Sequence, residues 1–223
     1  RLTYGDSDPA FAAHNQCGKL IRHDDPAGTQ FVTGYGLAGT VLAENRCFLV
    51  DLETPDWPIE LEARDALLEN RSFVTCHAFN PNGELRRQTD AMGNDRTFRY
   101  DLAGSLSEAW LLQAGDGKTR QRLVSDIQYN AYGQSESEIA GNGVVTRADY
   151  SADDGRLIRL MAQVGDQKPL QDLHYRYDPV GNIVELEDKS QAVTYFNNQR
   201  IDPINRYRYD SLYQLVEAKG WEA

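Results

Sequence analysis

Long apolar runs are missing from this sequence. Its longest apolar stretches are short pieces such as Phe48-Leu49-Val50, whereas a helix that spans a bilayer needs roughly 18 consecutive apolar residues. No signal-peptide pattern is present, and the first residue is Arg1 rather than Met. We therefore expect a fragment from which a targeting segment could have been removed, and we predict no membrane insertion by the fragment itself.

Cysteine is scarce, and the sequence has no metal-ligand pattern. Cys17, Cys47 and Cys76 are odd in number and widely spaced, whereas disulfide frameworks are even-numbered and dense, so we expect buried free thiols. His77 follows Cys76 directly, and on a strand two adjacent side chains face opposite ways. Neither the spacing of zinc ligands nor that of an EF-hand is found. We predict no metal site and no cofactor.

Positive charge is in the minority. Lysine and arginine number 23 against 34 acidic residues, which gives a net charge of 23 − 34 = −11. Nucleic acids and anionic membranes bind basic surfaces, so neither is expected as a main partner. The 40% apolar content and the length of 223 residues are sufficient for a folded chain with a core.

Glycine reveals a repeat. Turn-forming groups precede many glycines, as in Asp25-Pro26-Ala27-Gly28. An Asp or Asn side chain in such a group caps its own backbone, and glycine takes the positive φ that closes the turn. Three glycine triplets show almost the same spacing, of ten and then eleven or twelve residues: Gly18, Gly28 and Gly39; Gly83, Gly93 and Gly104; Gly133, Gly143 and Gly155.

The residues between these turns alternate in polarity. Thr97-Phe98-Arg99-Tyr100 and His174-Tyr175-Arg176-Tyr177 place aromatic side chains on one face and polar ones on the other, as in a half-buried strand. Strands at this spacing with glycine turns are typical of successive β-hairpins. We predict an all-β fold, in which repeated antiparallel hairpins build one long sheet.

Residues 51–71 interrupt the repeat. Thr54-Pro55-Asp56-Trp57-Pro58 is followed by good helix formers from Glu60 to Leu68, and a preceding proline favours a helix start. We expect a short helical or irregular insertion near 54–70, between hairpins. A linker between two domains is the weaker alternative, because the repeat continues on both sides. Residues 1–223 are therefore expected to form a single repeat domain.

The repeat takes a recognisable form from Tyr100 onward. Tyr100-Asp101, Tyr177-Asp178 and Tyr209-Asp210 each open a turn, and the set resembles the tyrosine–aspartate repeat of YD-repeat (Rhs-type) proteins. Residues 170–182, 196–199 and 205–215 are similar to the C components of bacterial Tc insecticidal toxin complexes. The residues assigned to the repeat motif, in a structural role, are Gly28, Gly39, Gly93, Gly104, Tyr100, Asp101, Gly143, Gly155, Tyr177, Asp178, Gly181, Tyr209 and Asp210.

This resemblance implies a function and partners. In that family, the B component and the N-terminal part of C form a hollow shell of spiralling β-sheet around a hypervariable C-terminal toxin. A self-cleaving, aspartate-dependent core severs the toxin, and the A component translocates it. The resemblance implies that this chain is a structural segment of the shell, made in the bacterial cytoplasm and secreted within the toxin complex. Its partners would be the B component, the rest of C and, indirectly, A.

Two other functions compete with the shell. A ladder of aromatic side chains fits a carbohydrate- or receptor-binding module, although aromatics spaced by two along strands more often pack within a sheet. The ladder consists of Phe98, Tyr100, Tyr175, Tyr177, Tyr207 and Tyr209. Asp178-Pro179-x-Gly181 matches a motif of the family's self-cleaving core, and Asp25-Pro26-x-Gly28 is a second match. Both are also good turn sequences. We predict no enzyme and no catalytic residue, and we expect the isolated segment to self-associate through its open strand edges.

Overall fold

The computed structural model describes residues 1–51, 56–115 and 119–220. The chain forms two compact units. Unit 1 comprises Arg1–Arg99 and Ala109–Gln121, and unit 2 comprises Tyr100–Glu108 and Arg122–Ala223. That residues 1–223 form one repeat domain stays a prediction.

Unit 1 contains the N-terminal strands and the helices α1 and α2. Neighbouring strands from β1 to β7 pair in chain order, and every pair is antiparallel. The elements are β1 (Leu2–Tyr4), α1 (Pro9–Ala12), β2 (Leu20–Asp25), β3 (Gly28–Tyr35), β4 (Val41–Leu49), α2 (Leu61–Asp65), β5 (Leu68–Phe79), β6 (Leu85–Thr89) and β7 (Asp95–Tyr100). Strand β8 (Leu106–Leu112) contributes residues to both units.

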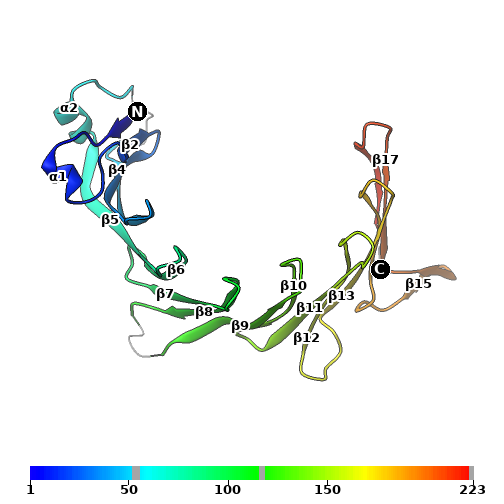
Figure 1. Cartoon of the computed structure of the whole chain (residues 1–223). Helices are drawn as coiled ribbons and strands as arrows, with labels where there is room; N and C mark the ends of the chain where they lie inside the picture. The colour runs from blue at the N-terminus through cyan, green and yellow to red at the C-terminus, as the bar shows by residue number, and fades with distance from the viewer. Residues whose placement is uncertain (52–55, 116–118, 221–223) are drawn as a thin grey trace. The chain divides into compact units, whose positions relative to one another are not determined.

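Unit 2 contains the regular repeat, again with antiparallel pairs in chain order (Figure 1). The exception is the pair β15 and β16, which forms a separate two-stranded sheet between β14 and β17 in the chain. The elements are β9 (Gln121–Tyr129), β10 (Ser135–Ala140), β11 (Val144–Tyr150), β12 (Leu157–Val164), β13 (Gln171–Tyr177), β14 (Ile183–Asp188), β15 (Thr194–Phe196), β16 (Gln199–Ile201), β17 (Ile204–Tyr209) and β18 (Leu215–Lys219).

The predicted fold class is confirmed, since sixteen of the strands belong to one antiparallel sheet in which strand order follows chain order. The predicted short helix is α2, in the segment after Trp57. Residues 52–55 of the expected insertion lie outside the described residues. Strand β5 already begins at Leu68, where it pairs with Leu49 of β4, so the irregular segment ends earlier than the sequence predicted.

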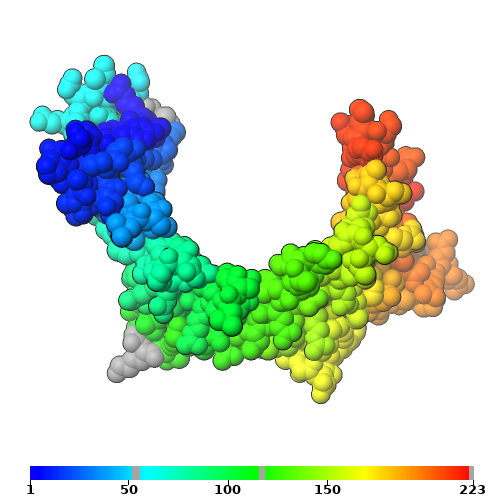
Figure 2. All heavy atoms as spheres, viewed as in Figure 1, coloured from blue at the N-terminus to red at the C-terminus, as the bar shows by residue number. Residues whose placement is uncertain are grey.

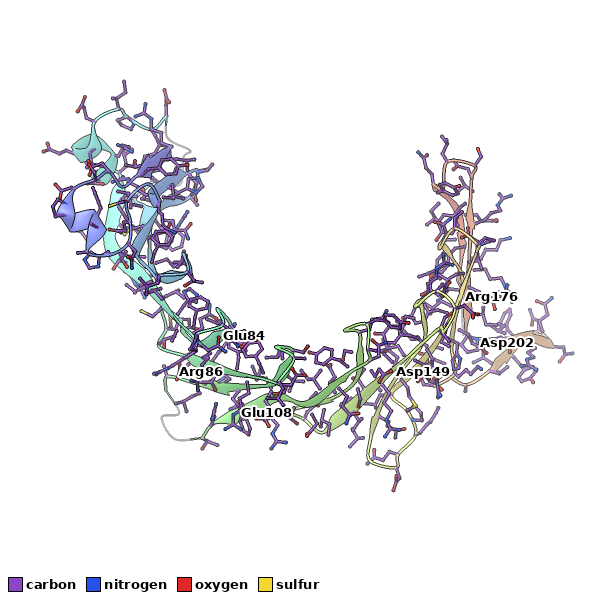
Figure 3. All side chains as sticks on the ribbon, viewed as in Figure 1. Glu84, Arg86, Glu108, Asp149, Arg176 and Asp202 are labelled. Carbon is purple, nitrogen blue, oxygen red and sulfur yellow. The ribbon has the colours of Figure 1, made fainter. Side chains whose placement is uncertain are left out.

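Apolar burial is concentrated in unit 1. Val32, Tyr35 and Leu49 expose less than a tenth of their surface. Among the described residues of unit 2, those buried to that degree are Ser125, Asp172, Ser190 and Pro203. Side chains stand on both faces of the sheet (Figure 3). Strands in such a sheet are stabilised mainly by their neighbours, through cross-strand side-chain pairs.

The prediction for the cysteines is partly wrong. All three thiols are free, but Cys17 and Cys76 are exposed and Cys47 is half-buried. Cys17 lies in the loop after α1 rather than on a strand, and Cys76 lies on the exposed side of β5 in the alternating burial pattern of that strand. No helix in the described part of the chain is long and apolar enough to cross a membrane.

Candidate functional site

One turn geometry recurs along the repeat. In six hairpins an Asp or Asn follows the first strand, and its Oδ1 accepts hydrogen bonds from the backbone amides two and four residues later. The distances are 2.8 to 3.1 Å for Asn80, Asp90, Asp101, Asn130, Asp178 and Asp210. The Asx side chain thus replaces the backbone partners that a tight turn lacks.

The fourth residue of each of these turns adopts the left-handed conformation. It is glycine at 83, 93, 104, 133 and 181, with φ between +78° and +107°. In the last turn the same place is held by Tyr213, at φ +61°. A residue with a side chain is strained by about 1–2 kcal/mol in this region. The backbone conformation of the last turn is therefore unfavourable for Tyr213.

The other predicted turn glycines also have positive φ. Gly39, Gly143 and Gly155 lie between +69° and +83°. Gly28 is different, because a Cβ there would lie 2.2 Å from the carbonyl oxygen of Cys47. It is needed for the close approach of β3 to β4 as well as for its φ of +140°.

A tyrosine hydroxyl bridges neighbouring hairpins. Tyr177, the last residue of β13, donates to the backbone carbonyl of Leu157, the first residue of β12, at 2.8 Å. The same relation joins the end of one strand to the start of the strand before it in the sheet in four further places: Tyr35 to Leu20, Tyr129 to Leu106, Tyr150 to Ser135, and Tyr209 to Ile183, at 2.6 to 3.0 Å. We call this contact the tyrosine clip.

The clip explains why tyrosine precedes the aspartate in the YD motif. The aspartate fixes the turn, and the tyrosine ties the strand before that turn to the preceding hairpin. Two of the turns depart from the rule. Strand β6 ends in Thr89 before Asp90, and β5 ends in Phe79, which has no hydroxyl to offer to Val41, the first residue of β4. Tyr100 is half-buried at the end of β7, directly before Asp101. The clip was not predicted from the sequence, although a tyrosine at the end of successive strands was its visible signal.

The two Asp-Pro-x-Gly aspartates lie in different units, each in a turn. Burial by itself raises the pKa of Asp178, but hydrogen bonds from Asn182, Gly181 and Val180 outweigh that effect and lower the pKa. Hydrogen bonds from Arg46 lower the pKa of Asp25 to about 2. Both carboxylates are thus held ionised, whereas a carboxyl group that acts as a general acid needs a raised pKa.

A buried cluster in unit 1 was also not predicted. Arg22 Nε and Arg64 Nη1 each lie 2.6 Å from a different oxygen of Asp24, and the Thr29 hydroxyl donates to the same carboxylate at 2.6 Å. Asp24 exposes only 2% of its surface. Although burial alone raises its pKa, the hydrogen bonds from Thr29, Arg22 and Arg64 lower it. The cluster fastens α2, which carries Arg64, onto β2 and β3.

No group of three or more His, Cys, Asp or Glu side chains that could hold a metal is found among the described residues. The repeated features of the described residues are the Asx turns and the tyrosine clips.

Comparisons with known proteins point to one family. No family model matches the chain. Toxin subunit YenC1 of Yersinia entomophaga is 37% identical over 230 residues, covering 100% of this chain and 23% of that protein. Toxin subunit YenC2 of the same organism is 34% identical, covering 99% of this chain and 24% of that protein.

Solved structures agree. The crystal structure of TcdB2-TccC3 matches with a TM-score of 0.86 and 36% identity, covering 99% of this chain and 11% of that chain. The Tc holotoxin pore of Photorhabdus luminescens matches with a TM-score of 0.86 and 37% identity, covering 99% of this chain and 10% of that chain. The chain spans about a quarter of the length of the curated relatives. By its repeat, its fold and these relatives, the chain belongs to the YD-repeat (Rhs-type) C components of Tc toxin complexes.

Proposed function

We propose that this chain is a wall segment of a hollow β-shell that encloses the C-terminal toxin of its own protein until delivery. Its partners are the B component and the remainder of the C component, and the A component acts later, in delivery. The assembled complex works outside the producing bacterium. The segment itself carries out no catalysis.

The observation that carries this proposal is the tyrosine clip. Each clip joins one hairpin to the one before it, so the sheet grows by a fixed step and its length is set only by the number of repeats. Such an array can form an extended single sheet without a large buried core, as the wall of a hollow shell requires. Solved relatives contain TcdB2 together with TccC3, which supports the choice of partners.

We infer that the segment is not catalytic from the hydrogen bonds and the pKa values of its two candidate carboxylates. The carboxylates of Asp25 and Asp178 are occupied by turn amides or an arginine, and their pKa values are low. The motif residues Tyr177, Asp178 and Gly181 make hydrogen bonds within and between hairpins, so their roles are structural.

The proposal is tested on the complete C component, co-expressed with its B component. Intact mass spectrometry of the purified complex is expected to show two pieces of the C component. The smaller, C-terminal piece is expected to resist added protease until the complex is denatured. A single uncleaved chain whose tail is digested at once would contradict the shell.

A carbohydrate- or receptor-binding module is the second candidate, favoured by one observation. The β15–β16 hairpin stands away from the rest of unit 2 (Figure 2), and it exposes 72% of Tyr195 and 66% of Phe196. Reproducible binding on a glycan array, lost on Tyr195→Ala, would support this candidate. No binding by the intact protein would remove it.

A further inference from the structure

An open cavity in unit 1 concentrates positive charge. It has a volume of about 400 Å³ and lies over strands β5, β6 and β7. Four arginines line it: Arg86 and Arg87 of β6, Arg99 of β7, and Arg120, which directly precedes β9. None of the described residues that line it is acidic, although the whole chain has a net charge of −11. The cavity therefore attracts anions, in contrast to the chain as a whole.

The pairing of the strands places several of these arginines on one face of the sheet. Ala78, Arg87 and Thr97 are register partners across β5, β6 and β7, so their side chains share a face. Arg99 lies two residues after Thr97 on the same strand and points to the same face. Arg120 reaches this face from outside the three strands, because its guanidinium donates to the Thr97 hydroxyl. Three guanidinium groups thus surround Thr97.

Contacts within unit 1 hold two of the arginines in place. The guanidinium of Arg120 lies 4.9 Å from the centroid of the Trp110 ring, and Arg87 Nε lies 2.7 Å from Asp95 Oδ1. Arg86 (Figure 3) is exposed and makes no hydrogen bond or ion pair with the described residues. The cavity therefore combines guanidinium groups in fixed places with one that is able to adjust to a ligand.

The spread of the arginines indicates the kind of anion. Neighbouring strands lie about 4.8 Å apart, and the four arginines come from β6, β7 and the start of the segment that leads into β9. A single phosphate ion covers only part of that width, whereas successive carboxylates of a peptide reach several guanidinium groups, each through paired hydrogen bonds. Phe79 and Phe98 also line the cavity, and they offer apolar contact to the body of a peptide.

We propose that this cavity binds an acidic peptide segment, whose carboxylates pair with Arg86 and Arg120 while an adjacent apolar side chain contacts Phe79 or Phe98. The segment belongs to the assembled complex of the B and C components and lies outside residues 1–223. The inference goes beyond the proposed wall and does not rest on it, because residues of unit 1 alone form the cavity.

Photo-crosslinking of the complete C component, in its purified complex with B, identifies the occupant. Ala78 lines the cavity and is exposed, so it is replaced by p-benzoylphenylalanine, and the irradiated complex is analysed by mass spectrometry. The expected product joins position 78 to a peptide outside residues 1–223 that carries clustered Asp or Glu residues. The absence of a crosslink, a crosslink only within residues 1–223, or a crosslink to a peptide without acidic side chains would overturn the proposal.

The role of the charges is tested at the same crosslinking position. Arg86→Gln combined with Arg120→Gln should lower the crosslink yield about tenfold, since each exposed ion pair contributes a factor of up to about five. Arg96→Gln is the matched control. Arg96 is an exposed arginine of β7 that pairs with Gln88, so it lies on the opposite face, and its loss should leave the yield unchanged. An undiminished yield in the double variant would remove the arginines from the account.

Inorganic phosphate separates a peptide site from a small-anion site. Sodium phosphate and sodium chloride at equal ionic strength should lower the crosslink yield to the same extent, because both act by screening the ion pairs. If phosphate abolishes the crosslink while chloride only weakens it, the cavity is a phosphate site and its assignment to an acidic peptide is wrong.

Discussion

The hairpins of β2–β5 and those of β9–β18 are fixed in different ways. In the first group, the buried carboxylate of Asp24 forms ion pairs with Arg22 and Arg64. Because Arg64 lies on α2, these ion pairs hold that helix against the strands. The second group has a smaller buried ionic contact, in which Asp172 of β13 lies against Arg159 of β12 and His174 of β13. Its hairpins are held by turn hydrogen bonds and by tyrosine clips that recur at each step.

The difference shows which part of the chain is extendable. A buried ion cluster depends on one set of partners and forms once. A local turn with a clip to the previous hairpin can be repeated without limit, because each step needs only its neighbour. We therefore propose that the hairpins of β9–β18 form the repeated part of the wall, whereas β2 and β3 carry the Asp24 cluster in addition to the Tyr35 clip.

The largest effect is expected in the clustered region. Asp24→Asn keeps the shape of the side chain but leaves the buried Arg64 without its counter-charge and Arg22 with Asp65 as its remaining carboxylate partner, which costs about 3–5 kcal/mol. Urea unfolding followed by circular dichroism measures the loss. The control is Asp65→Asn, because Asp65 also pairs with Arg22 but is 53% exposed, and its loss should cost less than about 1 kcal/mol. Equal effects of the two changes would show that the buried cluster does not hold the region.

The next comparison is between two turns of the repeat, one with Tyr213 and one with Gly133 in the left-handed conformation. Tyr213→Gly should stabilise unit 2 by about 1 kcal/mol, since it removes a side chain from the left-handed region. Gly133→Ala should destabilise by a similar amount, because its φ is +78° and a Cβ there meets no neighbour. Thermal unfolding of both variants checks the opposite signs. A loss of stability in Tyr213→Gly would mean that the tyrosine side chain matters more than its backbone strain.

Removal of a clip should cost about 1 kcal/mol, the net value of a hydrogen bond. Tyr177→Phe deletes only the hydroxyl that donates to Leu157. Tyr175→Phe is the matched control: this ring stacks on Tyr177 and makes no hydrogen bond within the described residues. Chemical denaturation of the two variants separates the clip from aromatic packing, and indistinguishable midpoints would argue that the clip contributes nothing.

The smallest effect should come from adding a missing clip. Phe79→Tyr offers a hydroxyl to the carbonyl of Val41 across the β4–β5 pair, and a gain of about 0.5–1 kcal/mol follows if the bond forms. Phe98→Tyr, inside β7 rather than at a strand end, should give no gain. If Phe79→Tyr leaves the free energy of unfolding unchanged or lowers it, the tyrosine clip does not form between β5 and β4 and is confined to the regular repeat.

The sequence was sufficient to predict the sheet, because turn chemistry is local and glycine spacing records it directly. It was also sufficient for α2, whose helix formers follow a proline. It was not sufficient for the clip, because a tyrosine at a strand end does not reveal which carbonyl its hydroxyl reaches. The same limit hid the Asp24 cluster, whose arginine from α2 comes from 40 residues later in the chain.

Errors about burial have a related cause. Alternation along a strand distinguishes two faces, but it does not say which face a neighbour covers. Cys76 was therefore expected inside, whereas the structure exposes it. The β15–β16 hairpin was likewise seen only as a similar sequence segment, since pairing of the main sheet from β14 directly to β17 is a long-range property.

The most direct test of the wall is whether its two faces differ in access. Arg176 (Figure 3) and Ile158 lie on opposite faces of neighbouring strands β13 and β12, and both are exposed in this segment. Single cysteines at the two positions, in a cysteine-free complete C component bound to B, are treated with a bulky polyethylene-glycol maleimide. A wall predicts that one position reacts at least about tenfold more slowly than the other, and that the two rates become equal on denaturation. Equal, fast reaction at both positions in the native complex would contradict the wall.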